Sequence, residues 1–97
     1  MAVMVIVELP AQPDRTEELK AFIRSIIDGT REFAGCRGLS MHENDDDPNE
    51  VMLVEQWESR GAHEKYVAWR TERGDFPTVI GMLAGPPSIR YFDSLDL

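Results

Sequence analysis

The sequence contains a single cysteine, few basic residues and no long hydrophobic segment. Cys36 has no partner within the chain, which excludes an internal disulfide. Ten Lys and Arg residues stand against 18 Asp and Glu, giving a formal net charge of -8. This balance argues against nucleic acid or an anionic membrane as a partner, because both bind through clusters of Lys and Arg.

No segment approaches the roughly 18 consecutive apolar residues of a membrane-spanning helix. The amino-terminal residues also lack a basic segment ahead of a short apolar one, the pattern of a secretory signal peptide. We therefore expect a cytoplasmic protein. We also expect one domain over residues 1–97, since this length is near the smallest at which a core is stable without metals or disulfides.

The first third of the chain predicts a strand followed by a helix. Val3–Leu9 is apolar except at Glu8 and rich in β-branched residues, which is typical of a strand buried on both faces. Asp14 and Glu17 form a potential capping box, and apolar residues then recur at helical spacing until Gly35. We expect an amphipathic helix of roughly four to five turns.

Two alternating segments follow, joined by a loop rich in turn-forming residues. Gly38–Glu43 and Val51–Trp57 each alternate with a period of two, which predicts two strands. Asn44–Asn49, with the sequence NDDDPN, predicts the hairpin loop between them. Its aspartates do not fit an EF-hand calcium site, because no starting position supplies both the required glycine and glutamate. We expect no metal site.

The last third predicts a helix, a second short helix and a final strand. Ser59 offers an N-cap hydroxyl to a helix that Gly74 ends. Asp75 is a candidate cap for a short helix, which Pro86 interrupts. Ser88–Phe92 alternates as a last strand.

The order β-α-β-β-α-(α)-β is the split βαβ pattern of a ferredoxin-like fold. We predict an α+β domain with a four-stranded antiparallel sheet and its two main helices on one face. The opposite face would expose more contiguous apolar area than a soluble monomer tolerates. A homodimer that stacks two such sheets face to face would cover it. A pocket between each sheet and its own helices is compatible with this arrangement.

Four features of the sequence occur together. They are FAGCRGL at Phe33–Leu39, the acidic loop DDDPNE, the run VMLVEQWES with its E-x-W-x-S spacing, and Ala62 in the following helix. In this combination, the chain resembles the antibiotic biosynthesis monooxygenase (ABM) family of the dimeric α/β barrel superfamily, over nearly its whole length. The resemblance implies a dimeric α/β barrel.

The resemblance implies a reaction less narrowly than a fold. Characterised members of the family include oxygenases that act on quinols or polycyclic aromatic compounds without metal or flavin, while others degrade haem or isomerise small carbonyl compounds. Many relatives carry a histidine eleven residues after Glu55, where this chain has Tyr66, and His63 lies three residues earlier. The haem-degrading branch has a tryptophan there and an asparagine on the first strand. This chain has neither, so no haem or other cofactor is expected.

Oxygenation without a cofactor needs a base, hydrogen bonds to a developing oxyanion and a dry aromatic pocket. Tyr66 and Trp69 lie on one helix face that should point at the sheet, where they either wall a pocket or pack in the core. An imidazole is a suitable base near neutral pH, so His42 is a candidate base if it faces a pocket rather than solvent.

Four further residues have two interpretations each. Arg70 could hold an anionic substrate or pair with an acidic neighbour such as Glu55. His63 could flank the pocket or be partly exposed. Glu55, if buried, must be hydrogen-bonded or paired, within the chain or across the dimer. Trp57 is a candidate substrate contact or a structural anchor.

Three hypotheses follow. The first is a cofactor-independent monooxygenase acting on a small quinol-like or polyphenolic substrate, with Tyr66 and His42 in catalysis. The expected substrate-binding residues are Trp69, Arg70, His63 and Trp57. The second is an isomerase or cyclase using the same pocket. The third is a non-catalytic dimeric barrel that binds a small hydrophobic ligand or serves as an interaction module.

Overall fold

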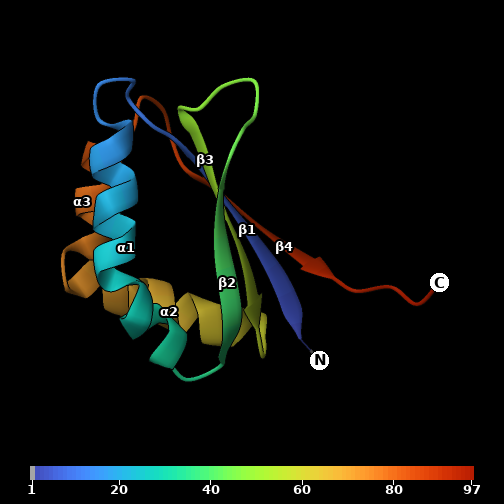
Figure 1. The fold of residues 1–97 in the computed structure, drawn as a ribbon. Coiled ribbons are helices and arrows are strands. Elements are labelled where there is room, and N and C mark those ends of the chain that lie inside the picture. The colour runs from blue at the N-terminus through green and yellow to red at the C-terminus, as the bar shows by residue number, and fades with distance from the viewer. Residues whose placement is uncertain (1) are drawn as a thin grey trace.

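The computed structural model describes residues 2–97, which form a four-stranded sheet with its helices on one face (Figure 1). The sheet order is β2-β3-β1-β4, and neighbouring strands are antiparallel. This confirms the predicted ferredoxin-like βαββαβ fold. The strands are β1 (Val3–Pro10), β2 (Cys36–Glu43), β3 (Glu50–Trp57) and β4 (Ser88–Asp93), and the helices are α1 (Thr16–Glu32), α2 (Arg60–Glu72) and α3 (Asp75–Gly81).

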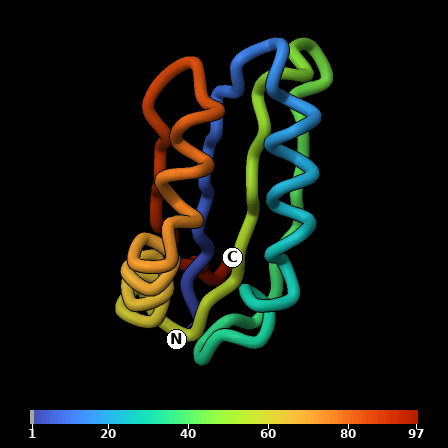
Figure 2. The backbone as a smooth tube through the Cα atoms, turned by 90° about the vertical axis from the view of Figure 1, so that its left-hand side faces the viewer, coloured from blue at the N-terminus to red at the C-terminus, as the bar shows by residue number. Residues whose placement is uncertain are grey.

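The helices divide the covered face of the sheet between them. In the view of Figure 2, α1 and α3 run along the two sides of this face, and α2 lies at the lower end of the α3 side, seen nearly end-on. Residues of all three helices line the space between the helices and the sheet. Within residues 2–97, no helix is long and apolar enough to cross a membrane.

The start of α1 differs from the prediction. Its N-cap is Arg15, and no side chain caps it, so the capping box of Asp14 and Glu17 does not form. Thr16 opens the helix instead, and its buried hydroxyl donates to Asn49 Oδ1 at 2.8 Å. This hydrogen bond ties the helix start to the loop between β2 and β3.

A glycine after α1 lets α2 approach closely. The helix ends at Glu32, and Gly35 follows with a positive φ of 94°. A Cβ at position 35 would lie 2.6 Å from the Ala62 Cβ. The side chain of Ser59 accepts a hydrogen bond from Ala62 N, which confirms the predicted N-cap. The first turn of α2 is thus fixed against the turn that ends α1.

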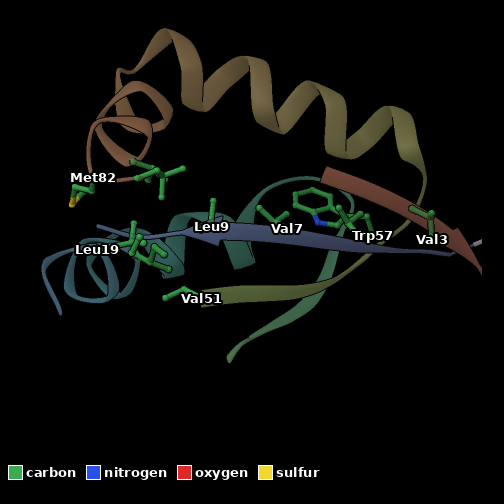
Figure 3. Close-up of a cluster of buried hydrophobic side chains, with 12 residues drawn as sticks. Val3, Val7, Leu9, Leu19, Val51, Trp57 and Met82 are labelled. Atoms are coloured by element: carbon green, nitrogen blue, oxygen red, sulfur yellow. The ribbon is translucent and has the colours of Figure 1, made fainter. Parts of the chain in front are cut away.

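Alternation along β1 separates the core from the open face of the sheet. Met4, Ile6 and Glu8 face away from the helices and are half-buried, and within residues 2–97 no helix covers them (Figure 1). Across the sheet, Ile6 pairs with Val54 and Arg90. The buried hydrophobic residues, several of them labelled in Figure 3, are Val3, Val5, Val7, Leu9, Ala11, Leu19, Ile23, Val51, Trp57, Val79, Met82 and Leu83.

Candidate functional site

A small cavity lies between the helices and the sheet. Its volume is about 80 Å³, and it is partly open to solvent. An engineered apolar cavity of roughly 150 Å³ binds benzene, so this one accepts a single ring only with a modest outward movement. Its apolar walls are Val7, Leu9, Ile23, Ile26, Ile27, Leu39, Leu53, Val67, Phe76, Val79 and Ile89. Its polar lining residues are Thr30, Glu55, His63, Tyr66, Arg70 and Asp75.

Arg70 organises one polar end of the cavity. The residue is only 4% exposed. Nη1 donates to Asp75 Oδ2 at 2.8 Å, and Nη2 donates to Ile26 O at 2.7 Å and to Thr30 Oγ1 at 3.0 Å. Nε donates to Tyr66 Oη at 3.0 Å. The acidic partner of Arg70 is therefore Asp75 and not Glu55.

The sequence suggested that Asp75 caps α3, but its carboxylate does not. Gly74, with a φ of 86°, is the N-cap of this helix. The carboxylate instead accepts hydrogen bonds from Arg70 and Arg73. Burial raises the pKa of Asp75, but these two hydrogen bonds outweigh it and hold the pKa below its usual value. Asp75 therefore stays ionised and neutralises the buried guanidinium.

Tyr66 places its hydroxyl between α1 and α2. Oη lies 2.7 Å from Thr30 Oγ1 and accepts the hydrogen bond from Arg70. Burial raises the pKa of Tyr66, and the hydrogen bonds with Thr30 and Arg70 only partly offset this. At neutral pH Tyr66 is consequently a phenol that can donate a hydrogen bond, not a base.

Sequence analysis missed Thr30, although the helical pattern contained a signal for it. Thr30 follows Ile23, Ile26 and Ile27 at the same i, i+3, i+4 spacing, so it is a hydroxyl on an otherwise apolar helix face. It is only 2% exposed. A buried hydroxyl needs a partner, and here Tyr66 and Arg70 provide it.

Glu55 and His63 form the other polar end of the cavity, and both are almost fully buried. Glu55 Oε1 accepts a hydrogen bond from Trp57 Nε1 at 2.7 Å and lies 3.6 Å from His63 Nε2. Burial raises the pKa of Glu55 and lowers the pKa of His63 to about 4. The imidazole is thus neutral at neutral pH, and its contact with Glu55 is not a salt bridge.

The second nitrogen of His63 contacts a residue that sequence analysis did not assign to the site. His63 Nδ1 lies 2.8 Å from Tyr91 Oη on β4. Tyr91 is half-buried, and the guanidinium carbon of Arg60 lies 4.2 Å from its ring centroid. Glu55, His63 and Tyr91 therefore form a row that leads from the cavity towards the surface.

Two predicted substrate contacts lie behind the cavity lining. Trp57 is completely buried, and its ring centroid lies 5.0 Å from that of Tyr66 and 5.4 Å from that of His63. Trp69 packs on Phe33 with a centroid distance of 5.1 Å. Neither tryptophan lines the cavity. Both tryptophans pack behind the side chains that line the cavity.

His42 lies on the other side of the sheet. Alternation along β2 turns Leu39 towards the cavity and His42 towards the open face. There His42 Nε2 lies 2.7 Å from Ser40 Oγ. The expectation that His42 shares a pocket with Tyr66 is wrong for this geometric reason.

Comparisons with known proteins show the family and support the fold. The sequence model described as antibiotic biosynthesis monooxygenase matches residues 2–70. Rv0793 from Mycobacterium tuberculosis is 27% identical, with a TM-score of 0.86 and coverage of 100% of this chain and 98% of that chain. Among the curated proteins compared with this chain, none matches.

Two more distant structures show the same fold. A conserved protein from Methanosarcina mazei Go1 is 18% identical, with a TM-score of 0.86 over 95% of this chain and 91% of that chain. PA3566 from Pseudomonas aeruginosa is 22% identical, with a TM-score of 0.79 over 98% of this chain and 95% of that chain. At these identities the likeness concerns the fold alone.

Proposed function

Because the chain belongs to the antibiotic biosynthesis monooxygenase family, we propose that it is a cofactor-independent monooxygenase acting on a small quinol. One observation supports this most directly. The cavity combines apolar walls with the buried Tyr66 hydroxyl, which Arg70 and Thr30 hold in place. An aromatic ring fits such walls, and a fixed donor suits the oxygen of the ring.

Tyr66 would stabilise the substrate in its electron-rich form. Its phenol donates a hydrogen bond to the quinol oxygen as negative charge develops there. Arg70 strengthens this donor, because its Nε–H polarises Tyr66 Oη from the other side. The charge of Arg70 is already balanced by Asp75, so the guanidinium acts through Tyr66 and not as a free anion site.

The reaction balances with oxygen as the only co-substrate. A quinol and O₂ give a hydroxyquinone and water. One oxygen atom enters the ring, the other leaves as water, and the substrate supplies all four electrons. The small volume of the cavity, about 80 Å³, favours a single ring over a polycyclic substrate.

The open sheet face supports a homodimer of this chain. Members of the ABM family typically form dimeric α/β barrels, in agreement with the dimer expected from the sequence. Half-buried apolar side chains at Met4, Ile6, Met52 and Val54 lie together on this face of β1 and β3. A second copy of the sheet would cover them.

Oxygen uptake tests the proposed function. The purified protein is given a panel of hydroquinones, and uptake is followed with ¹⁸O₂ so that one labelled atom in the product marks a monooxygenase. Tyr66→Phe should lower turnover at least about tenfold, because it removes the donor. Thr71→Val, which removes an exposed hydroxyl from the same helix, is the matched control. No protein-dependent uptake across the panel would refute the proposal.

The balanced charge of Arg70 also suits a second candidate, a non-catalytic barrel that binds a small hydrophobic ligand. In that case the hydroquinones would raise the melting temperature without oxygen uptake. An isomerase or cyclase is distinguished by turnover under anaerobic conditions.

A further inference from the structure

The cavity contains one carboxyl group that the network around Arg70 does not use. Glu55 is 3% exposed and lines the cavity together with His63 and Tyr66. Its Oε1 accepts the hydrogen bond from Trp57, while within residues 2–97 no hydrogen bond is made to Oε2. One oxygen is thus anchored, and the other is available to a bound molecule.

We propose that Glu55 is the general base that removes the quinol proton and that His63 and Tyr91 position it. This proposal rests on the monooxygenase function proposed above and adds the base that Tyr66 does not supply. It assigns a catalytic role to Glu55 and positioning roles to the other two residues.

The acidity of Glu55 suits this role better than that of Asp75, the other acid in the cavity. Burial raises the pKa of Glu55, and the hydrogen bond from Trp57 only partly offsets the rise. A carboxylate with a raised pKa is a stronger base and also a usable acid near neutral pH. The Asp75 carboxylate is held by Arg70 and Arg73 at a lowered pKa, which makes it a poor proton acceptor.

Tyr91 determines which nitrogen of His63 carries the hydrogen. Burial raises the pKa of Tyr91, so its hydroxyl stays protonated. It can therefore donate a hydrogen bond to His63 Nδ1, which lies 2.8 Å away. The neutral imidazole then carries its hydrogen on Nε2, which faces Glu55 Oε1. The opposite tautomer would direct a lone pair at the carboxylate. The 3.6 Å separation must shorten by about 0.5 Å to form a hydrogen bond.

The proton taken by Glu55 can be returned within the same cycle. Glu55 removes the proton from a quinol hydroxyl, and the resulting anion gives electrons to O₂. A bond forms between a ring carbon and oxygen, leaving a peroxide anion. The protonated Glu55 then donates its proton to that peroxide. The O–O bond breaks as the ring C–H proton and the hydroxide leave together as water, so no proton is gained or lost overall.

Glu55→Gln is the principal test. The amide oxygen can still accept the hydrogen bond from Trp57, so the side chain keeps its place while the base is lost. We expect kcat/KM at neutral pH to fall about 100-fold or more. The loss should shrink as the pH approaches about 10, the pKa range of a phenol, because the quinol then ionises without a base. Rates are corrected for oxidation without protein.

Tyr91→Phe tests the positioning role separately. It removes only the hydroxyl, so Glu55 loses an oriented donor and the acidic limb of the kcat/KM profile should move to higher pH. The titratable groups that face Glu55 are His63 and Tyr66 on α2, Tyr91 on β4 and Cys36 on β2. Thr71→Val should leave the limb unchanged.

The outcomes separate the two proposals. If the wild-type protein takes up no oxygen, both fail. If the wild type is active, the monooxygenase function stands. Glu55 is then not the base if kcat/KM of Glu55→Gln equals that of the wild type, or is lower by the same factor at every pH. If Tyr91→Phe leaves the acidic limb in place, the positioning role is wrong.

Discussion

In an Asp75→Ala variant, the Arg70 guanidinium would lose its carboxylate partner while remaining buried. The two side chains are 15% and 5% exposed, and their closest N–O distance is 2.8 Å. Removing one partner of a buried ion pair costs roughly 3–5 kcal/mol. Arg70 would keep its hydrogen bonds to Ile26, Thr30 and Tyr66. We therefore expect a loss near the lower limit, about 3 kcal/mol in the free energy of unfolding.

Urea unfolding at neutral pH and fixed protein concentration measures this loss. Concentration must be fixed because the stability of the proposed dimer would depend on it. For a domain of this size, the same loss lowers the melting temperature by roughly 12–24 °C. Asp28→Ala is the matched control, since Asp28 is 90% exposed and lies 3.7 Å from Arg31. A loss in Asp75→Ala below about 1 kcal/mol, the value of a surface pair, would refute the reasoning.

The pH dependence of the same difference is a second check. The folded-state pKa of Asp75 is lowered, because the hydrogen bonds from Arg70 and Arg73 outweigh the opposing effect of burial. Such a group adds stability above its unfolded pKa of about 3.9 and loses it as the pH falls through the folded pKa. The difference between wild type and Asp75→Ala should be constant above about pH 5 and shrink below about pH 4. A difference that grows in acid would contradict the assignment.

Two further predictions concern the open face of the sheet. His42→Gln should change kcat/KM for oxygen uptake less than about twofold, because His42 lies outside the cavity. A fall in kcat/KM as large as that of Tyr66→Phe would show that His42 does belong to the site. Sedimentation of the wild type should give about twice the chain mass of 11.0 kDa. Val54→Glu should shift the protein towards the monomer, because it adds a charge to the half-buried apolar face. A folded wild-type monomer would refute the dimer.

The fold was predictable because its main signals are local. The alternation along β3 and the helical spacing in α1 each lie within one segment, and both elements form as predicted. On β1, which the sequence predicted to be buried on both faces, only one face is fully buried, and Met4, Ile6 and Glu8 on the other are half-buried. The errors concern side chains whose partners lie elsewhere in the chain. Asp75 was expected to cap α3, and Asp14 with Glu17 to cap α1, but Asp75 binds Arg70, and α1 begins at Thr16, which binds Asn49. At these two helix starts, tertiary contacts replaced the expected caps, whereas the cap predicted at Ser59 forms.

The site was less predictable because its side chains converge from distant segments. The helical wheel correctly turned Tyr66 towards the cavity, but it placed Trp69 there too, and Trp69 packs on Phe33 while Arg70 lines the cavity. It could not show that Arg70 reaches Ile26 O, 44 residues earlier, or that His63 reaches Tyr91, 28 residues later. In the proposed reaction those contacts divide the roles, because Arg70 supports Tyr66 as a hydrogen-bond donor and occupies Asp75, which leaves Glu55 as the carboxyl group open to a bound molecule. The sequence therefore pointed to the helix that carries most of the candidate site, whereas the proposed roles depend on which strand or helix each side chain contacts.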